Sequence, residues 1–176
     1  MALLAEELVE EWIRREGYFT IRGVRLGLQE IDLLALSLRD GSPVARHVEV
    51  QASVRPVNFV TPLTREIQTA RGVGPAAAVG RSSEEMRSCV EAWIGRKFHH
   101  PRKKAIRGAL VPEVSWSLEL VLHEVKHEDE VDLLREHVTV HRLRDVVAAL
   151  EKTTGVVPAA AGADFVDLIE LGAPRP

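Results

Sequence analysis

Two apolar runs, each carrying a carboxylate, decide the fold of this chain: Glu30-Ile31-Asp32-Leu33-Leu34-Ala35-Leu36 and His47-Val48-Glu49-Val50-Gln51-Ala52. Both runs are typical of β-strands, and Asp40-Gly41-Ser42-Pro43 between them predicts a turn. A carboxylate in an apolar strand is costly to bury without a partner, and two carboxylates on adjacent strands repel each other unless a cation lies between them. The pair therefore indicates a divalent-metal site.

The flanking segments predict an α/β fold. Residues 2–16 form an amphipathic helical pattern that Gly17 ends. Strands are expected over 18–22, 30–38, 44–52, 115–123 and 138–141, and helices over 63–70, 82–98, 101–110, 130–136 and 142–151. The region 23–27 is expected to turn, and 115–123 to alternate between a buried and a wet face. This order predicts a mixed β-sheet flanked by helices in one domain over 1–152, followed by a loop and a short helix in 153–176.

Composition limits the class of protein. The chain has 176 residues, of which 45% are hydrophobic, enough for one domain with its own core. No apolar run reaches the ~20 residues of a membrane span, so we expect no membrane partner. Cys89 is the single cysteine, which excludes an internal disulfide, and the N-terminus lacks a basic leader. We therefore expect a cytoplasmic protein, and a homodimer is compatible with the sequence.

Charge is distributed unevenly along the chain. Residues 51–111 carry 11 basic and 4 acidic side chains, whereas residues 112–176 carry 6 basic and 13 acidic ones. The net charges are therefore +7 and −7, although the whole chain has only −3. A basic segment next to an acidic one predicts an electrostatic footprint on one side of the molecule, as nucleic-acid-binding proteins have.

The spacing of the carboxylates carries a family resemblance. Glu49 and Gln51 lie two apart on a strand and share a face with His47, and Asp32 enters from the preceding strand. Here the chain resembles the PD-(D/E)XK nuclease superfamily, the fold of many restriction endonucleases and of archaeal Holliday junction resolvases. Its pattern is an Asp on one strand, E-x-K on the next and, in many members, a Glu in the first helix. Glu6 follows Ala5 and precedes Gly17 by eleven residues, as in the resolvase-like pattern.

The resemblance implies a restriction endonuclease-like fold and metal-assisted hydrolysis of phosphodiester bonds, with DNA favoured over RNA as the partner. Asp32, Glu49 and the carbonyl of Val50 would hold Mg²⁺ or Mn²⁺. Glu6 would reach the same site through water, and Gln51 would orient the attacking water. Removing Asp32 or Glu49 would then abolish cleavage and relieve like-charge repulsion in the metal-free protein.

Gln51 stands where this superfamily usually has lysine. Its amide can donate a hydrogen bond to water or phosphate, but it carries no charge. Two functions therefore stay open. One is an active nuclease, DNA-cleaving or RNA-cleaving, in which glutamine substitutes for lysine. The other is an inactive nucleic-acid-binding or interaction module on the same fold. A third interpretation of the carboxylates is an ordinary sheet with one wet face, in which Asp32 caps a strand or pairs with an arginine and Glu6 is solvated.

The basic segment supplies candidate phosphate contacts. These are Arg55, Arg65, Arg96, Lys97, Arg102, Lys103, Lys104 and Arg107. The alternative is a solvated helix face. Trp93 and Phe98 lie close enough to stack on bases, but their helical spacing favours a place in the core.

The string His123-Glu124-Val125-Lys126-His127 matches a zinc protease motif, which requires both histidines on one turn of a helix. His123 ends the alternating strand and an acidic loop follows, so we reject a zinc site here. His137 and His141 have the same spacing and are rejected for the same reason.

Overall fold

The computed structural model describes residues 2–53 and 55–152. Within them the chain forms a five-stranded mixed sheet flanked by six helices, which confirms an α/β class. The elements are α1 (Ala2–Arg15), β1 (Phe19–Leu26), β2 (Gln29–Arg39), β3 (Ser42–Gln51), α2 (Arg65–Arg71), α3 (Ser83–Lys97), α4 (Pro101–Leu110), β4 (Trp116–Leu122), α5 (Glu128–Arg135), β5 (Thr139–Arg142) and α6 (Leu143–Glu151).

The sheet has the strand order β1-β2-β3-β4-β5. The first three strands are antiparallel neighbours, while β4 runs parallel to β3 and β5 parallel to β4. Antiparallel pairs can be joined by tight turns, and Asp40 and Gly41 both have positive φ angles, which a two-residue hairpin of type I′ requires. The parallel pairs need crossovers, and α2 to α4 and then α5 supply them.

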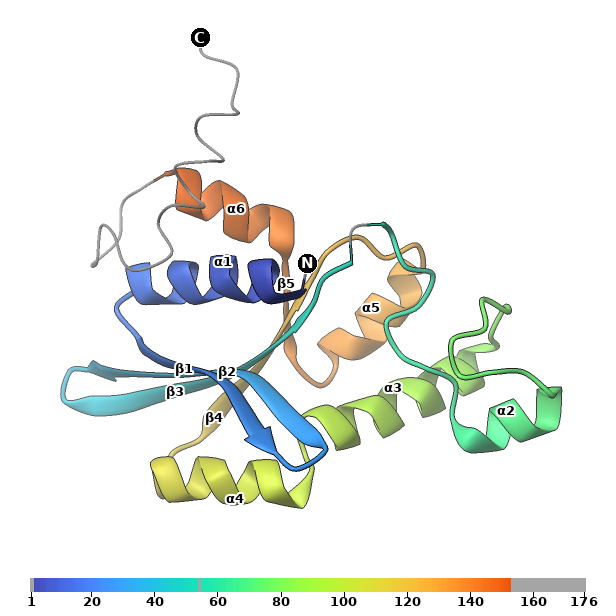
Figure 1. The fold of residues 1–176 in the computed structure, drawn as a ribbon, viewed down its shortest axis with the longest axis horizontal. Coiled ribbons are helices and arrows are strands. Elements are labelled where there is room, and N and C mark those ends of the chain that lie inside the picture. Colours follow the sequence, from blue (N-terminus) through green and yellow to red (C-terminus); the bar gives the residue numbers. More distant parts are fainter. Residues whose placement is uncertain (1, 54, 153–176) are drawn as a thin grey trace, which may run out of the picture.

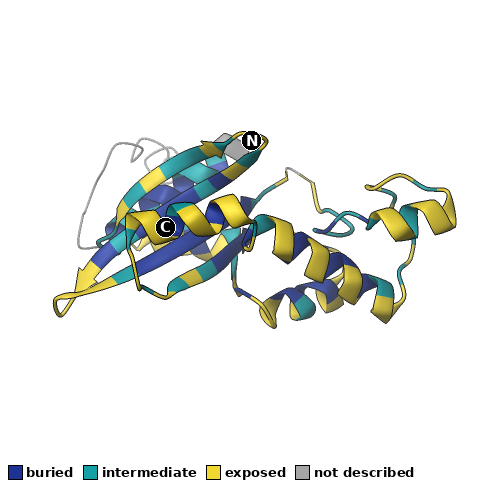
Figure 2. Cartoon of the chain, turned by 90° about the horizontal axis from the view of Figure 1, so that it is seen from below, coloured by how far each residue is buried: buried dark blue, intermediate teal, exposed yellow. Residues whose placement is uncertain are grey.

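Helices cover both faces of the sheet (Figure 1). On one face, α1 and α6 pack on side chains of β2, β3 and β4, including Leu33, Val48 and Val121. On the other, α3 and α5 pack on Leu120 and Leu122 of β4. The dark strip of buried residues along the central strands in Figure 2 reflects this double cover. Consecutive residues of β3 therefore point to two different buried environments.

The termini of most elements agree with the expectations to within two residues, and α4 begins at Pro101 and ends at Leu110, as predicted. Two expectations were wrong. The chain does not turn at Gly23, because β1 continues through it to Leu26 and the reversal occurs at Gly27. β4 has no wet face at its centre, because Glu119 is buried against Arg46 at 2.6–2.7 Å under α1.

The helix expected at 164–171 lies outside the described residues. Trp93 and Phe98 are buried in the core beneath α3, as their spacing predicted. In the described part of the chain, no helix combines the length and apolar character that crossing a bilayer requires.

Candidate functional site

The two strand carboxylates lie at neighbouring positions on one face of the sheet. Leu33 of β2 is registered with Val48 of β3, so the antiparallel pairing brings Asp32 opposite Glu49 one step further on. Alternation turns both away from the α1 face that Leu33 and Val48 occupy. Asp32 Oδ2 accepts a hydrogen bond of 2.8 Å from the backbone N–H of Val50, which ties its carboxylate to β3.

Glu49 is fully buried, and three side chains donate to its carboxylate. His47 Nε2 and Lys103 Nζ lie 2.8 Å and 2.6 Å from Oε1, and Lys97 Nζ lies 2.8 Å from Oε2. Two buried donors thus hold Oε1, while the donor to Oε2 is the more accessible one. The Lys103 side chain is 1% exposed and that of Lys97 is 23% exposed.

Arg107 fixes the tautomer of His47. Its guanidinium lies against Nδ1 of the buried imidazole, and a guanidinium can only donate. Nδ1 is therefore the acceptor, and Nε2 carries the proton that His47 donates to Glu49. Burial, opposed by the nearby Glu49, lowers the pKa of His47 below its ordinary value, so this side chain is neutral near pH 7.

The surroundings drive the pKa values of the two carboxyls apart. Burial alone would raise the pKa of Glu49, but the hydrogen bond from His47 and the charges of Lys97 and Lys103 lower it to about 2. Burial and the negative charge of Glu49 raise the pKa of Asp32 to about 7, against the opposing effects of Lys97 and the Val50 N–H. Glu49 is thus charged at neutral pH, whereas Asp32 exchanges its proton near neutrality, a division of roles typical of acid–base sites.

Glu6 acts electrostatically on this pair, and Gln51 lies two residues beyond Glu49 on β3. Burial and the charge of Glu30 raise the pKa of Glu6, and Lys97 and Glu49 are close enough to act on it as well. Glu6 also contributes to the raised pKa of Asp32, so the three carboxyls share one electrostatic environment. Gln51 ends β3 beside Leu122 and borders a cavity of about 100 Å³ together with Phe59 and Val60.

The structure divides the predicted phosphate contacts into two groups. Lys103 and Arg107 are buried and face Glu49 and His47, so they are not part of a solvated helix face. The exposed members are Arg55, Arg65, Arg96, Arg102 and Lys104. Lys97 is intermediate between the two groups, since its side chain is half-buried. Burial acts to lower the pKa of Lys97, but the charges of Glu49 and Asp32 outweigh it and raise this pKa.

The site has hard oxygen donors for one divalent cation. In the described residues, no cluster of three or more histidine, cysteine, aspartate or glutamate side chains is arranged as a metal site. Mg²⁺, however, commonly uses only one or two carboxylates and retains several waters. Asp32 uses Oδ2 for the Val50 N–H, and Glu49 Oε2 has Lys97 as its donor. The raised pKa of Asp32 indicates that Lys97 and Lys103, which both contact Glu49, leave the charge of the second carboxylate incompletely compensated. Asp32 and Glu49 are therefore the residues that could hold Mg²⁺ or Mn²⁺.

Sequence reasoning missed the donors that surround Glu49. It placed His47 on the correct face without a role, and it expected Lys103 and Arg107 in contact with phosphate. Their spacing held the signal, since residues four apart lie on the same face of a helix. Lys103 and Arg107 are the buried residues of α4, which therefore docks on the sheet through charged side chains.

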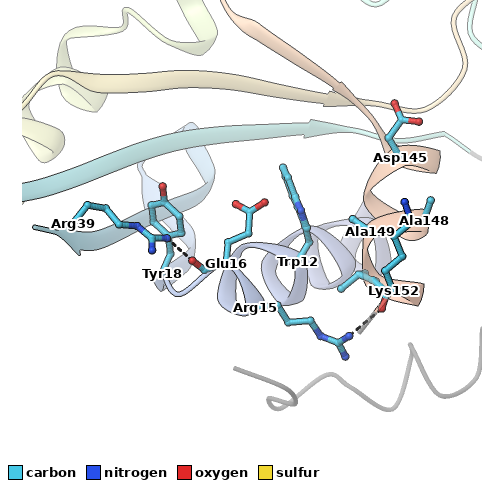
Figure 3. A pocket seen from close by; sticks show the side chains of 10 residues that line it. Trp12, Arg15, Glu16, Tyr18, Arg39, Asp145, Ala148, Ala149 and Lys152 are labelled. Atoms are coloured by element: carbon cyan, nitrogen blue, oxygen red, sulfur yellow. Dashed lines mark hydrogen bonds between the residues drawn. The ribbon is translucent and has the colours of Figure 1, made fainter. Parts of the chain in front are cut away.

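A separate cavity lies on the other face of the sheet. It measures about 680 Å³, and Trp12, Tyr18, Arg15 and residues of α6 line it (Figure 3). Arg15 is already engaged there by Glu11 and by the Leu150 carbonyl. None of the side chains predicted for the site is in this lining, so the cavity is not an extension of the carboxylate pair.

The rejected zinc motif is divided between two elements. His123 follows the last residue of β4, and His127 precedes α5 and stacks on Phe59 with ring centroids 4.2 Å apart. The two histidines therefore do not share a helical turn, as expected.

Comparison of the chain with family models, curated proteins and solved structures finds no match in any of the three.

Proposed function

We propose that this protein is a divalent-metal-dependent phosphodiesterase that cleaves nucleic acid, with DNA favoured over RNA. The observation that carries the proposal is the pairing of Asp32 and Glu49 on adjacent strands with a lysine ammonium at Glu49 Oε2. The α/β sheet, the Asp on β2, the E-x-Q on β3 and the Glu on α1 are consistent with the PD-(D/E)XK resemblance. A restriction endonuclease-like fold is part of this proposal.

In the proposed site, Asp32, Glu49 and the Val50 carbonyl hold Mg²⁺ or Mn²⁺. Such a cation lowers the pKa of a bound water and polarises the scissile phosphate. His47 and Lys103 keep the Glu49 carboxylate ionised and fix its orientation through Oε1. Gln51 donates its amide to the attacking water, and Glu6 contacts the site through a second water.

Lys97 supplies the positive charge that Gln51 lacks. It is the last residue of α3, and its Nζ lies 2.8 Å from Glu49 Oε2, whereas the Val50 N–H of β3 ties Asp32 to the same strand as Glu49. A lysine at position 51 would bring its ammonium from the same strand as Glu49, whereas here the ammonium comes from a helix. In the proposed reaction, Lys97 offsets the charge that develops on the phosphate.

The exposed basic residues of the segment 55–104 would bind the phosphate backbone. Arg96 and Lys97 are consecutive at the end of α3, and Arg102 and Lys104 follow in the first turn of α4. They therefore lie on the two helices that bring Lys97 and Lys103 to Glu49. Contacts of this type bind without regard to sequence, so the proposal includes no sequence specificity.

A second candidate is a binding module on the same fold that does not cleave. The observation that favours it is the enclosure of Glu49 by three protein donors, together with the neutral Gln51. Incubation with linear, supercoiled, branched and single-stranded DNA, and with RNA, in Mn²⁺ or in chelator separates the two. Cleavage that requires the metal supports the phosphodiesterase, and binding without cleavage supports the module.

A further inference from the structure

The two oxygens of Glu49 differ in how firmly the protein holds them. Oε1 receives His47 Nε2 and Lys103 Nζ, both from side chains that are out of contact with solvent. Arg107 supports His47 from behind, so three residues determine the position of Oε1. Among the described residues, Oε2 receives Lys97 alone, which is 23% exposed and reaches it through a flexible four-carbon chain from the last residue of α3.

Lys97 also lies where a cation is needed. Its charge acts on both Glu49 and Asp32, and Asp32 accepts a hydrogen bond from the Val50 N–H. Of the two ammoniums that contact Glu49, that of Lys97 lies on Oε2, the oxygen that His47 and Lys103 do not contact. A divalent cation can therefore replace the Lys97 ammonium at Oε2 without disturbing Oε1, since His47 and Lys103 do not contact Oε2.

We infer that Lys97 is the internal counter-ion of this site in the metal-free protein and that it leaves Glu49 Oε2 when a divalent cation binds. The inference rests on the proposed function, because it concerns the same metal site. Its consequence is that the protein's affinity for the metal includes competition from its own lysine. Once released, the ammonium remains at the mouth of the site, where it is free to contact a phosphate oxygen.

Binding of Mn²⁺ alone, measured by electron paramagnetic resonance without nucleic acid, tests the competition. The variants are Lys97→Met, which keeps an unbranched side chain one atom shorter and removes its charge, and Lys126→Met, in which an exposed lysine before α5 is changed. Removing a charge next to a metal ligand should lower the Kd for Mn²⁺ by about tenfold or more. Lys126→Met should bind as the wild type does. An unchanged or weaker affinity in Lys97→Met would overturn the inference.

A second measurement uses the wild type and needs no variant. The rate of acetylation of each lysine, followed by mass spectrometry, should rise at Lys97 when Mn²⁺ is added, because the amine is released from its ion pair. Acetylation of Lys103 and Lys126 should not change. Mn²⁺ binding without any change at Lys97 would contradict the exchange, and absence of Mn²⁺ binding in every variant would overturn the metal site as well. Binding with exchange but no cleavage of nucleic acid would instead reject only the proposed activity.

Discussion

Lys103 Nζ lies 2.6 Å from Glu49 Oε1, and neither side chain has appreciable contact with solvent. The pair joins α4 to the centre of the sheet. A buried ammonium without a partner costs several kcal/mol, so each member of the pair depends on the other. Glu49 is therefore a structural residue of the metal-free protein as well as a candidate ligand.

Glu49→Ala should destabilise the protein by about 3–5 kcal/mol, since it leaves Lys103 buried without a counter-ion. This differs from the sequence-based expectation that either carboxylate could be removed with relief of repulsion. Urea denaturation compared with Glu124→Ala, which changes an exposed glutamate, measures the effect. A Glu49→Ala protein as stable as the wild type would show that Lys103 finds another partner.

Asp32→Asn should stabilise the protein, by an amount that depends on pH. The pKa of Asp32 is raised to about 7, so the folded state favours the protonated carboxyl, and stability is lost as pH rises from the unfolded pKa of about 4 through 7. Asparagine keeps an acceptor for the Val50 N–H and carries no charge. A shift of about three pKa units corresponds to about 4 kcal/mol, which solvent screening reduces to about 2.

The free energy of unfolding of Asp32→Asn should thus exceed that of the wild type at pH 8, and the difference should shrink towards pH 4. Because Glu49 has a pKa of about 2, its own stabilisation persists throughout this window. Denaturation at several pH values provides the measurement. A constant difference between pH 4 and pH 8 would argue against titration of Asp32 in this range.

Exchanging residues 51 and 97 tests which of them supplies the cation. Lys97→Gln should lower metal-dependent cleavage strongly, by about 10²-fold or more, because it removes a charge that acts in the transition state. Gln51→Lys alone should change cleavage little, since Lys97 is already present. Adding Gln51→Lys to Lys97→Gln should restore part of the lost rate. If the double variant is no faster than Lys97→Gln, an ammonium at position 51 cannot replace the one at 97.

Only the exposed basic residues should affect the salt dependence of nucleic-acid binding. The triple variant Arg96→Gln, Arg102→Gln, Lys104→Gln should weaken binding about equally across sequences and reduce the log–log salt slope by roughly one unit per lost phosphate contact. Arg135→Gln with Arg144→Gln, exposed arginines of α5 and α6, is the control. Equal slopes for the triple variant and the wild type would place the binding surface elsewhere, with Arg55 and Arg65 next to be tested.

The sequence predicted the strands and the shared face of Glu49 and His47 because alternation over a short apolar run is a local signal. It also predicted α4 from Pro101, a residue suited to the first turn of a helix. Local signals could not reveal that α4 turns Lys103 towards Glu49, a contact between residues 54 positions apart. A run of basic residues predicts a solvated or phosphate-binding surface. Lys103 and Arg107 are instead buried against the sheet, because the crossover from β3 to β4 carries α4 across its face.

The burial of Glu119 shows the same limit. An alternating strand predicts one wet face, and β4 would have one if no helix covered it. Here α1, from the start of the chain, covers that face, and Arg46 on β3 compensates the carboxylate through two hydrogen bonds. A charged residue at an alternating position is therefore compatible with burial whenever a neighbouring strand carries its partner.

The most direct test of the proposed metal-dependent phosphodiesterase is the cleavage of supercoiled and branched DNA in Mn²⁺. The wild type is compared with Asp32→Asn, and Lys126→Met serves as a folded control. We expect metal-dependent cleavage by the wild type and by Lys126→Met, and none by Asp32→Asn, which should be at least as stable as the wild type at pH 8. Wild-type protein that leaves every nucleic acid intact, or Asp32→Asn that cleaves as fast as the wild type, would contradict the proposal.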